Sequence, residues 1–365
     1  MAGADHIQIL NDGIKQLKED RINGARVLAT NALQTLRAIT LNSSDTISTP
    51  EELWDLLRLA SYKLILARPS MSAAVTSALV NCLQAVQESA SRESSEEPNA
   101  SIALPVHKEA VANTICEQIK KRNESMSRLS KAFVEYLRHL LTKKTRVHIL
   151  TLSSSSTIFA CLEQAVNELA GLSMTITVLE SRPRMEGATF AVNFLSKMKS
   201  RGKGNNIEVV VAPDSHVCTV AKSIDMLLLG ADRISSAGDV CNKMGSFPAA
   251  MAAKTLSKAD VVVITETDKI ARPGVTEAHG HENNDSREVY SGWPEDTIAV
   301  MKSLSKSDFD VRNIYFEWIP SEYVSMYVTE RGILDAHAIK RMSEERAVME
   351  DELFSNSIKE SAMLE

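Results

Sequence analysis

The sequence predicts an α/β fold in which an N-terminal helical domain is followed by a Rossmann-like domain with a parallel sheet. Apolar residues recur at helical spacing before residue 145, and short, continuously apolar runs alternate with helical segments after it. Buried apolar strands that alternate with helices are typical of a parallel sheet with helices on both faces. At roughly 150 residues per domain, the 365 residues accommodate two domains, which we expect at 1–145 and 146–365.

The first part of the chain carries helix signals in order. One helix face collects apolar residues at three- and four-residue steps, namely Ile7, Leu10, Ile14 and Leu17. Thr49, Pro50 and Glu52 form the start of a second helix, because they match an N-cap, a first-turn proline and a capping box. The Ser- and Glu-rich stretch Glu88–Ser101 predicts a solvated loop, and a long helix is expected from Glu109 to Leu141.

The second part alternates strand and helix patterns. The predicted strands are Val147–Leu152, Thr175–Leu179, Ile207–Val211, Met226–Leu229 and Val261–Thr265. The predicted helices are Thr157–Leu169, Ala188–Lys199, Ser215–Lys222 and Phe247–Leu256. A last apolar segment, Asn313–Thr329, predicts further sheet or a short closing helix.

Polar residues follow each predicted strand, where α/β sheets bind their ligands. These exits are Ser153–Ser156, Glu180–Pro183, Pro213–Ser215, Gly230–Asp232 and Glu266–Lys269. The four serines precede a helix, so they suit either a bound phosphate or an ordinary helix cap. No Gly-x-Gly-x-x-Gly or Walker lysine follows the first strand, which disfavours a dinucleotide site or a P-loop.

Two arginines stand before prolines and have two interpretations each. Pro183 restricts the backbone of Arg182, and a guanidinium fixed at a strand exit suits bidentate binding of phosphate or carboxylate. The alternative is a salt bridge to Glu180 or Glu186. Arg68 allows the same two interpretations.

Asp232 and the pair Asn242-Lys243 are further candidates. A carboxylate at the end of a buried strand is suited to proton transfer, although a turn or cap is the ordinary alternative. The amide and ammonium of Asn242-Lys243 suit a phosphorylated or polyhydroxylated ligand, although many lysines are only solvated surface residues.

Composition excludes several classes of protein. With 44% hydrophobic and 24% charged residues the chain is of the soluble globular type, and its net charge of −6 disfavours direct nucleic-acid binding. No stretch approaches the ~18–20 apolar residues of a membrane helix, and Met1–Leu10 lacks a signal-peptide pattern. The five cysteines lack zinc-site spacing, and His279–Glu282 lies in a polar segment. We expect a cytoplasmic protein without membrane association, metal or cofactor.

Several motifs, taken in order, resemble one family. They are Ala67-Arg68-Pro69, Glu180-Ser181-Arg182-Pro183 with Gly187, Gly230-Ala231-Asp232, Gly238–Gly245, Trp318–Tyr323 and Thr329–Gly332. The set resembles the superfamily of the alpha, beta and delta regulatory subunits of translation initiation factor 2B, which also contains ribose-1,5-bisphosphate isomerase and methylthioribose-1-phosphate isomerase. The resemblance covers nearly the whole chain. It implies a ligand between the two domains and dimerisation through the C-terminal one, often with further assembly.

The resemblance also implies roles for individual residues. In the isomerase branch an aldose 1-phosphate becomes a ketose phosphate, and a cysteine after the first strand works with the aspartate of the Gly-Ala-Asp motif. Asp232 matches that aspartate. The positions expected to bind ligand are Gly24, Ala25, Arg68, Ser154, Ser155, Arg182, Asn242, Lys243 and Lys269.

The chain departs from the isomerase pattern at two places. The pattern Thr-His-Cys-Asn-Ser appears as Thr151–Ser155, so Ser153 stands in place of the thiol and Leu152 in place of the histidine. A thiol titrates near pH 8.5 and can be tuned into an acid or a thiolate, which an unactivated serine does not easily replace. An Arg-Gly-Ala motif appears as Asn23-Gly24-Ala25, which removes a positive charge.

We therefore expect a regulatory-subunit-like protein that binds a phosphorylated sugar or nucleotide, with isomerase activity weak or lost. One alternative is an active aldose–ketose isomerase that uses Asp232, with Ser153 or a nearby group replacing the thiol. Another is a structural partner in a translation initiation complex, with an empty cleft. The expected protein partners are further copies in a homodimer or larger homo-oligomer, with other initiation factor 2B-type subunits as additional candidates.

Overall fold

The structure is a computed structural model that describes residues 5–20, 24–43, 47–68, 72–96, 103–204, 206–274 and 283–363. Its helices are α1 (His6–Glu19), α2 (Ala25–Leu41), α3 (Pro50–Leu66), α4 (Ser72–Glu96), α5 (Leu104–Leu141), α6 (Ser156–Glu168), α7 (Glu186–Ser200), α8 (Val217–Val220), α9 (Ser246–Ala252), α10 (Arg287–Tyr290), α11 (Glu295–Ser303), α12 (Ala336–Leu353) and α13 (Asn356–Met363). None of the helices in these ranges is both long enough and apolar enough to cross a membrane.

The strands form two sheets in the described residues. They are β1 (Val147–Leu152), β2 (Met174–Leu179), β3 (Ile207–Ala212), β4 (Met226–Leu229), β5 (Arg233–Ile234), β6 (Val240–Lys243), β7 (Asp260–Ile264), β8 (Phe316–Ile319), β9 (Met326–Thr329) and β10 (Gly332–Leu334). The larger sheet has the order β10-β9-β7-β4-β1-β2-β3, and the smaller has the order β5-β6-β8.

The larger sheet has Rossmann-like topology. From β9 to β3 neighbouring strands are parallel, and β10 runs antiparallel to β9 at the edge. The chain moves outward in one direction from β1 and then in the other from β4, so the strand order reverses between these two strands. Such a switch point is where α/β sheets bind ligands, beyond the carboxyl ends of the strands. The predicted fold class, a helical region followed by a parallel sheet, is confirmed.

The chain divides into two compact units. The helical unit contains Met1–Ser125, Asp268–Gly274 and Lys340–Glu365, and the α/β unit contains Met126–Thr267 and Val275–Ile339. This division by contacts does not test the predicted domain boundary at residue 145, which remains a prediction.

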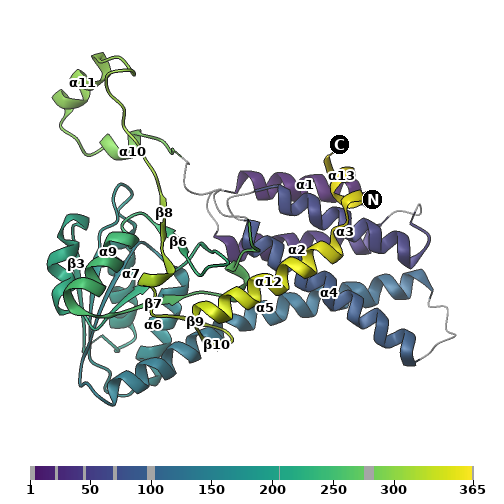
Figure 1. Ribbon diagram of the computed structural model, residues 1–365, viewed down its shortest axis with the longest axis horizontal. Coiled ribbons are helices and arrows are strands. Elements are labelled where there is room, and N and C mark those ends of the chain that lie inside the picture. The colour runs from purple at the N-terminus through teal and green to yellow at the C-terminus, as the bar shows by residue number, and fades with distance from the viewer. Residues whose placement is uncertain are drawn as a thin grey trace. The chain divides into compact units, whose positions relative to one another are not determined.

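Each unit has its own apolar core. In the helical unit, buried leucines and alanines of α1 to α4 pack with Leu353, Phe354 and Ile358 near the C-terminus. In the α/β unit, buried residues of the central strands pack against α5, α6 and α7, with Phe159 edge-on to Phe194 at 5.4 Å. Figure 1 shows that α10 and α11 stand away from the sheet of their own unit, and neither helix has a buried residue.

The expected elements mostly form where the sequence places them. The five predicted strands match β1, β2, β3, β4 and β7 to within a residue at each end. At the start of α3, Glu52 N–H donates to Thr49 Oγ1 at 3.2 Å and Thr49 N–H donates to the Glu52 carboxylate at 3.2 Å, which confirms the capping box. The predicted long helix is α5, which begins five residues earlier, at Leu104.

Three expectations need correction or completion. The loop expected from Glu88 is wrong as far as Glu96, because α4 continues to that residue; alanine, glutamate and arginine, all present in this stretch, are good helix formers. Residues 97–101 lie outside the described ranges. The helix expected at Ser215–Lys222 is a series of short turns around α8. The segment Asn313–Thr329 supplies strands β8 and β9 rather than a helix.

Candidate functional site

The exits of β1, β2 and β3 are joined by hydrogen bonds. Ser153 N–H donates to Ser181 Oγ at 2.7 Å, and the hydroxyl of Ser181 donates to Leu179 O at 3.1 Å. The N–H groups of Ser181 and Arg182 donate to the two oxygens of the Asp214 carboxylate at 2.9 and 2.7 Å. These contacts hold three strand exits in one fixed arrangement.

Ser153 and Ser181 both have a left-handed backbone, with φ of 63° at each. Such a conformation costs a residue other than glycine about 1–3 kcal/mol and is concentrated at functional sites. The bond between the two serines connects these strained positions. The strain therefore lies at the position where the sequence comparison expects the isomerase thiol.

The serine loop after β1 has both a capping and a connecting role. Ser155 is the N-cap of α6 and accepts from Ile158 N–H at 3.3 Å, so the ordinary cap interpretation holds for this residue. Ser154 is exposed. A Cβ on Gly230 would lie 3.3 Å from Ser155 Oγ and 3.8 Å from Asn242 Oδ1. The exits of β1 and β4 and strand β6 thus meet at Gly230, where the lack of a side chain permits close approach.

Asp232 lies at this meeting point, after β4. Its N–H donates to Cys241 O at 2.9 Å, and the residue is partly exposed. Burial, and to a smaller extent the charge of Asp232, raises the pKa of the Cys241 thiol to about 12. The carboxylate of Asp232 is therefore close to a thiol that stays protonated at neutral pH.

Asn242 and Lys243 are buried, so the interpretation of Lys243 as a solvated surface residue is wrong. Asn242 Nδ2 donates to Ser246 Oγ at 2.9 Å. The ammonium of Lys243 lies 2.7 Å from Glu186 Oε2 and 4.3 Å from the centre of the Tyr315 ring. Because Glu186 belongs to the first turn of α7 and Tyr315 precedes β8, two distant segments hold this lysine in place.

Arg182 is exposed, and its Nη2 donates to Val289 O at 3.3 Å in the segment that contains α10. The same segment contacts Tyr315, whose hydroxyl donates to the Glu288 carboxylate. Burial and the bond to Glu288 raise the pKa of Tyr315 to about 12. The guanidinium of Arg182 thus contacts α10 at Val289.

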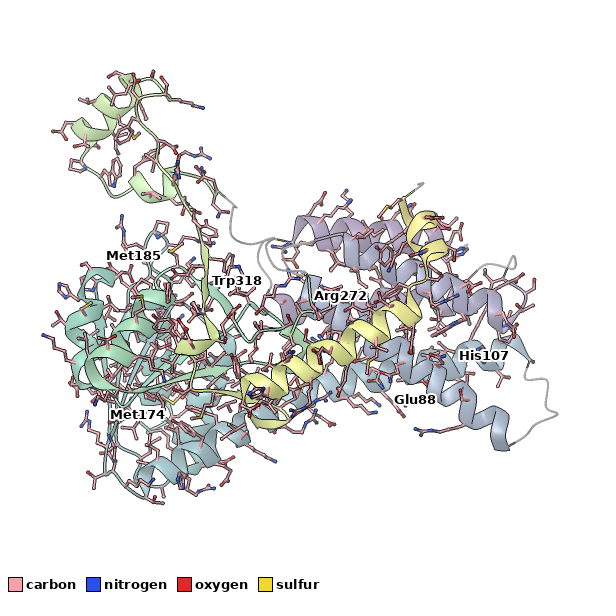
Figure 2. The ribbon with its side chains drawn as sticks, viewed as in Figure 1. Glu88, His107, Met174, Met185, Arg272 and Trp318 are labelled. Carbon is pink, nitrogen blue, oxygen red and sulfur yellow. The ribbon has the colours of Figure 1, made fainter. Side chains whose placement is uncertain are left out.

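Glu317 is a residue that the sequence reasoning missed. It pairs with Asn242 across β6 and β8, and its Oε1 accepts from Gly245 N–H at 2.6 Å and Phe247 N–H at 3.0 Å. Burial raises the pKa of Glu317 although these bonds act to lower it. On the neighbouring position of β8, Figure 2 labels Trp318, which pairs with Cys241. Glu186, Tyr315 and Glu317 had no local motif to identify them.

The remaining predicted positions belong to the helical unit. Gly24 is the N-cap of α2 without a side-chain capping bond, and Ala25 begins that helix. The Arg68 guanidinium donates to Asp20 O. Lys269 is in the short turn Thr267–Lys269 after β7. The structure thus gathers Ser153, Asp232 and Asn242 with their neighbours in one unit, and it places these four residues in the other.

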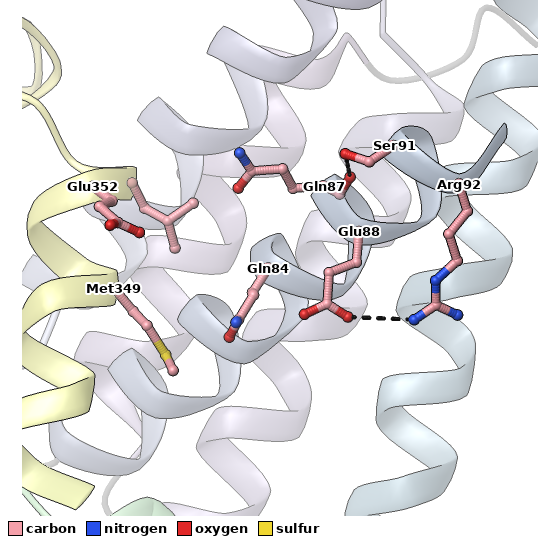
Figure 3. Close-up of a pocket in the computed structure, with 8 residues that line it drawn as sticks. Gln84, Gln87, Glu88, Ser91, Arg92, Met349 and Glu352 are labelled. Carbon is pink, nitrogen blue, oxygen red and sulfur yellow. Dashed lines mark hydrogen bonds and ion pairs between the residues drawn. The ribbon is translucent and has the colours of Figure 1, made fainter. Parts of the chain in front are cut away.

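The helical unit also contains an open pocket of about 430 Å³ between α4 and α12. Figure 3 shows Glu88 and Arg92 on one side and Met349 and Glu352 on the other. No predicted site residue lines this pocket. In the described residues, no three histidine, cysteine, aspartate or glutamate side chains form a cluster that could hold a metal ion, and His279–Glu282 lies outside those residues.

Comparison with known proteins identifies the family. The model of the "Initiation factor 2 subunit family" matches residues 21–336, which is most of the chain. The chain belongs to the Initiation factor 2 subunit family.

Curated relatives in this family are isomerases. The chain is 29% identical over 211 residues to methylthioribose-1-phosphate isomerase from Cereibacter sphaeroides, an alignment that covers 54% of this chain and 55% of the relative. It is 26% identical over 255 residues to ribose 1,5-bisphosphate isomerase from Archaeoglobus fulgidus, covering 66% of this chain and 75% of the relative. The matched region thus spans about half the length of the first relative.

Solved structures share the fold of this family member. eIF2B beta from Chaetomium thermophilum has a TM-score of 0.66 at 15% identity, covering 92% of this chain and 90% of that one. The tetrameric eIF2B-beta2-delta2 complex from C. thermophilum contains a chain with a TM-score of 0.65 at 15% identity, covering 92% and 94%. The 5-methylthioribose 1-phosphate isomerase from Pyrococcus horikoshii OT3 has a TM-score of 0.60 at 19% identity, covering 93% and 87%. At these identities the likeness concerns the fold.

Proposed function

We propose that this member of the Initiation factor 2 subunit family binds a phosphorylated sugar at the switch point of its sheet, and that it isomerises that sugar only slowly. The observation that carries the proposal is the joining of the strand exits around Ser153, Gly230 and Asn242, next to Asp232. Sugar phosphates are the chemistry named for the curated relatives.

Each residue of the proposed site has a chemical role. Asp232 supplies the acid/base carboxylate, Asn242 the amide for ligand hydroxyls, and Arg182 the phosphate-binding guanidinium. Ser154, Ser155 and Lys243 complete this part of the site. Gly24, Ala25, Arg68 and Lys269 remain ligand-binding positions that we propose from the sequence alone.

The slow reaction follows from position 153. Ser153 supplies a hydroxyl, and the nearby thiols do not replace the missing sulfur. Cys161 and Cys241 are both fully buried, and burial raises the pKa of each to about 12. A buried, protonated thiol neither contacts a ligand that enters from solvent nor provides a thiolate.

Thermal shift with ribose 1,5-bisphosphate and with methylthioribose 1-phosphate tests the binding proposal. We expect at least one of them to stabilise the protein, and we expect Arg182→Ala to reduce that effect. If neither compound shifts the melting temperature of the wild-type protein, the binding proposal is wrong.

An active isomerase is the second candidate, favoured by the activity named for the curated relatives and by the presence of Asp232. The two candidates differ in turnover. Rapid conversion of either sugar phosphate by the wild-type protein, abolished by Asp232→Asn, would establish the second candidate.

We further propose a cytoplasmic protein that forms homodimers or larger homo-oligomers, with other initiation factor 2B-type subunits as candidate partners. The five cysteines are free thiols, as expected in a reducing compartment. Solved relatives include a complex of beta and delta subunits. Light scattering should give at least twice the 40.1 kDa mass of one chain; a monomer at micromolar concentration contradicts this part of the proposal.

A further inference from the structure

The turn Thr267–Lys269 lies where the chain passes from one unit to the other. Thr267 is the last residue of its segment in the α/β unit, and Asp268 is the first residue of the next segment in the helical unit. On the first side, Thr267 N–H donates to Glu330 Oε2 at 3.0 Å, and its hydroxyl donates to the other oxygen of that carboxylate. Thr267 is therefore fixed to the strand end of its own unit.

Two arginines of the helical unit hold the other side of the turn. Arg122 Nη1 donates to Asp268 Oδ2 at 2.7 Å, from α5. Arg346 Nη1, from α12, donates to Asp268 O at 3.2 Å and to Ile270 O at 2.7 Å. The two carbonyls held by Arg346 belong to the residues directly before and after Lys269.

Helix α12 makes a further contact with the same segment. Ser343 Oγ donates to Ala271 O. Ser343 and Arg346 are three residues apart, so they share one face of the helix, and both are buried. This face of α12 therefore binds three carbonyls in the segment Asp268–Ala271.

We propose that Arg346 is a positioning residue for Lys269 in ligand binding. Lysine reaches a phosphate through four flexible methylene groups, so the position of its backbone decides where the ammonium can go. By holding the carbonyls on both sides of Lys269, Arg346 fixes the backbone position from which that side chain extends. The inference rests on the proposed function, in which Lys269 binds the phosphorylated ligand.

A double-mutant cycle separates positioning from general stabilisation. Arg346→Met keeps an apolar side chain similar to the methylene stem of arginine and removes every hydrogen-bond donor of the guanidinium. We expect it to raise the Kd for ribose 1,5-bisphosphate by about tenfold, within the range of coupling between contacting groups. In a Lys269→Ala background the same change should raise Kd by less than about twofold.

Conservative and control variants sharpen this test. Arg346→Lys retains a cationic donor and should recover part of the affinity, and Ser343→Ala should weaken binding by about twofold because one carbonyl contact remains unmade. Arg341→Met changes an exposed arginine on the same helix and should leave Kd unchanged. An equal loss of affinity in the wild-type and Lys269→Ala backgrounds would show that Arg346 does not act through Lys269.

Hydrogen–deuterium exchange of the unliganded protein gives an independent result. Arg346→Met should accelerate amide exchange across residues 266–271 and leave β1 and β4 unchanged. Unchanged exchange in this segment overturns the positioning role even if the ligand binds. If the wild-type protein binds neither sugar phosphate, the proposed function fails, while the exchange result still decides whether Arg346 holds the turn.

Discussion

Ser153 sits in a strained left-handed conformation and donates its N–H to Ser181 Oγ, so a second strand exit holds its backbone in place. Motif comparison identified this position from the sequence because it directly follows a clear strand. The sequence did not reveal the hydrogen bond, because Ser181 follows a different strand. That position 153 stands in an isomerase-type binding frame remains our proposal.

The ion pair between Lys243 and Glu186 gives a first prediction. The Lys243 side chain is 7% exposed and its ammonium is 2.7 Å from Glu186 Oε2. Replacing Glu186 with Gln leaves a buried charge unpaired and should lower the free energy of unfolding by about 1–3 kcal/mol. Urea denaturation measures this change.

Glu208→Gln is the matched control. Glu208 pairs with Arg146 at 2.6 Å, but both side chains are about half exposed, so the loss should be under about 1 kcal/mol. Equal losses for the two variants would contradict the assignment of a buried pair at Lys243.

Glu317 gives a prediction of pH dependence. Burial raises the pKa of its carboxyl above the ordinary 4.5. The contribution of the protonated group to stability is then fully present below pH 4.5 and is lost as the pH rises through the folded-state value. Glu317→Gln keeps an oxygen acceptor for Gly245 and Phe247 without the charge. Its stability relative to wild type should therefore increase between pH 4 and pH 7 in denaturation measurements; a constant or falling difference contradicts this account.

At the scale of elements, continuously apolar runs predicted the central strands because each is buried on both faces. Strands β5 and β6 of the smaller sheet were not predicted, since they have only two and four residues and are too short for a periodicity. Strand β8 lies in the segment Asn313–Thr329, for which sheet or a short helix was expected. The end of α4, from Glu88 to Glu96, was predicted as a loop because this Ser- and Glu-rich stretch also suits a loop. Local composition identified the long elements and missed those that depend on distant partners.

The close approach of α7 to β2 gives a prediction at this scale. A Cβ on Gly187 would lie 1.9 Å from Leu179 O, a backbone atom that cannot move away alone. Gly187→Ala should lower the free energy of unfolding by about 3 kcal/mol or more, measured by thermal or urea denaturation. Asn193→Ala, at an exposed position of the same helix, should change it by no more than about 0.5 kcal/mol. A comparably small effect at Gly187 would mean that the helix does not pack this closely.

At the scale of the whole molecule, the fold class was predictable and the composition of the two units was not. Residues 268–274 and 340–365 join the helical unit through contacts such as Arg122 with Asp268 and Arg58 with Leu353. Such contacts connect segments that have no shared local pattern. The same reason explains why Glu186 and Tyr315 were not identified as the residues that hold Lys243.

The central claim is that the chain retains the binding frame of an isomerase and lacks the thiol at position 153. Its most direct test compares turnover of ribose 1,5-bisphosphate and methylthioribose 1-phosphate by the wild-type protein and by Ser153→Cys, alone and with Leu152→His. We predict slow turnover by the wild type and an increase of about 100-fold or more on restoring the thiol, in line with the usual contribution of one acid–base group. Rapid turnover by the wild type that Ser153→Cys fails to increase would contradict the account.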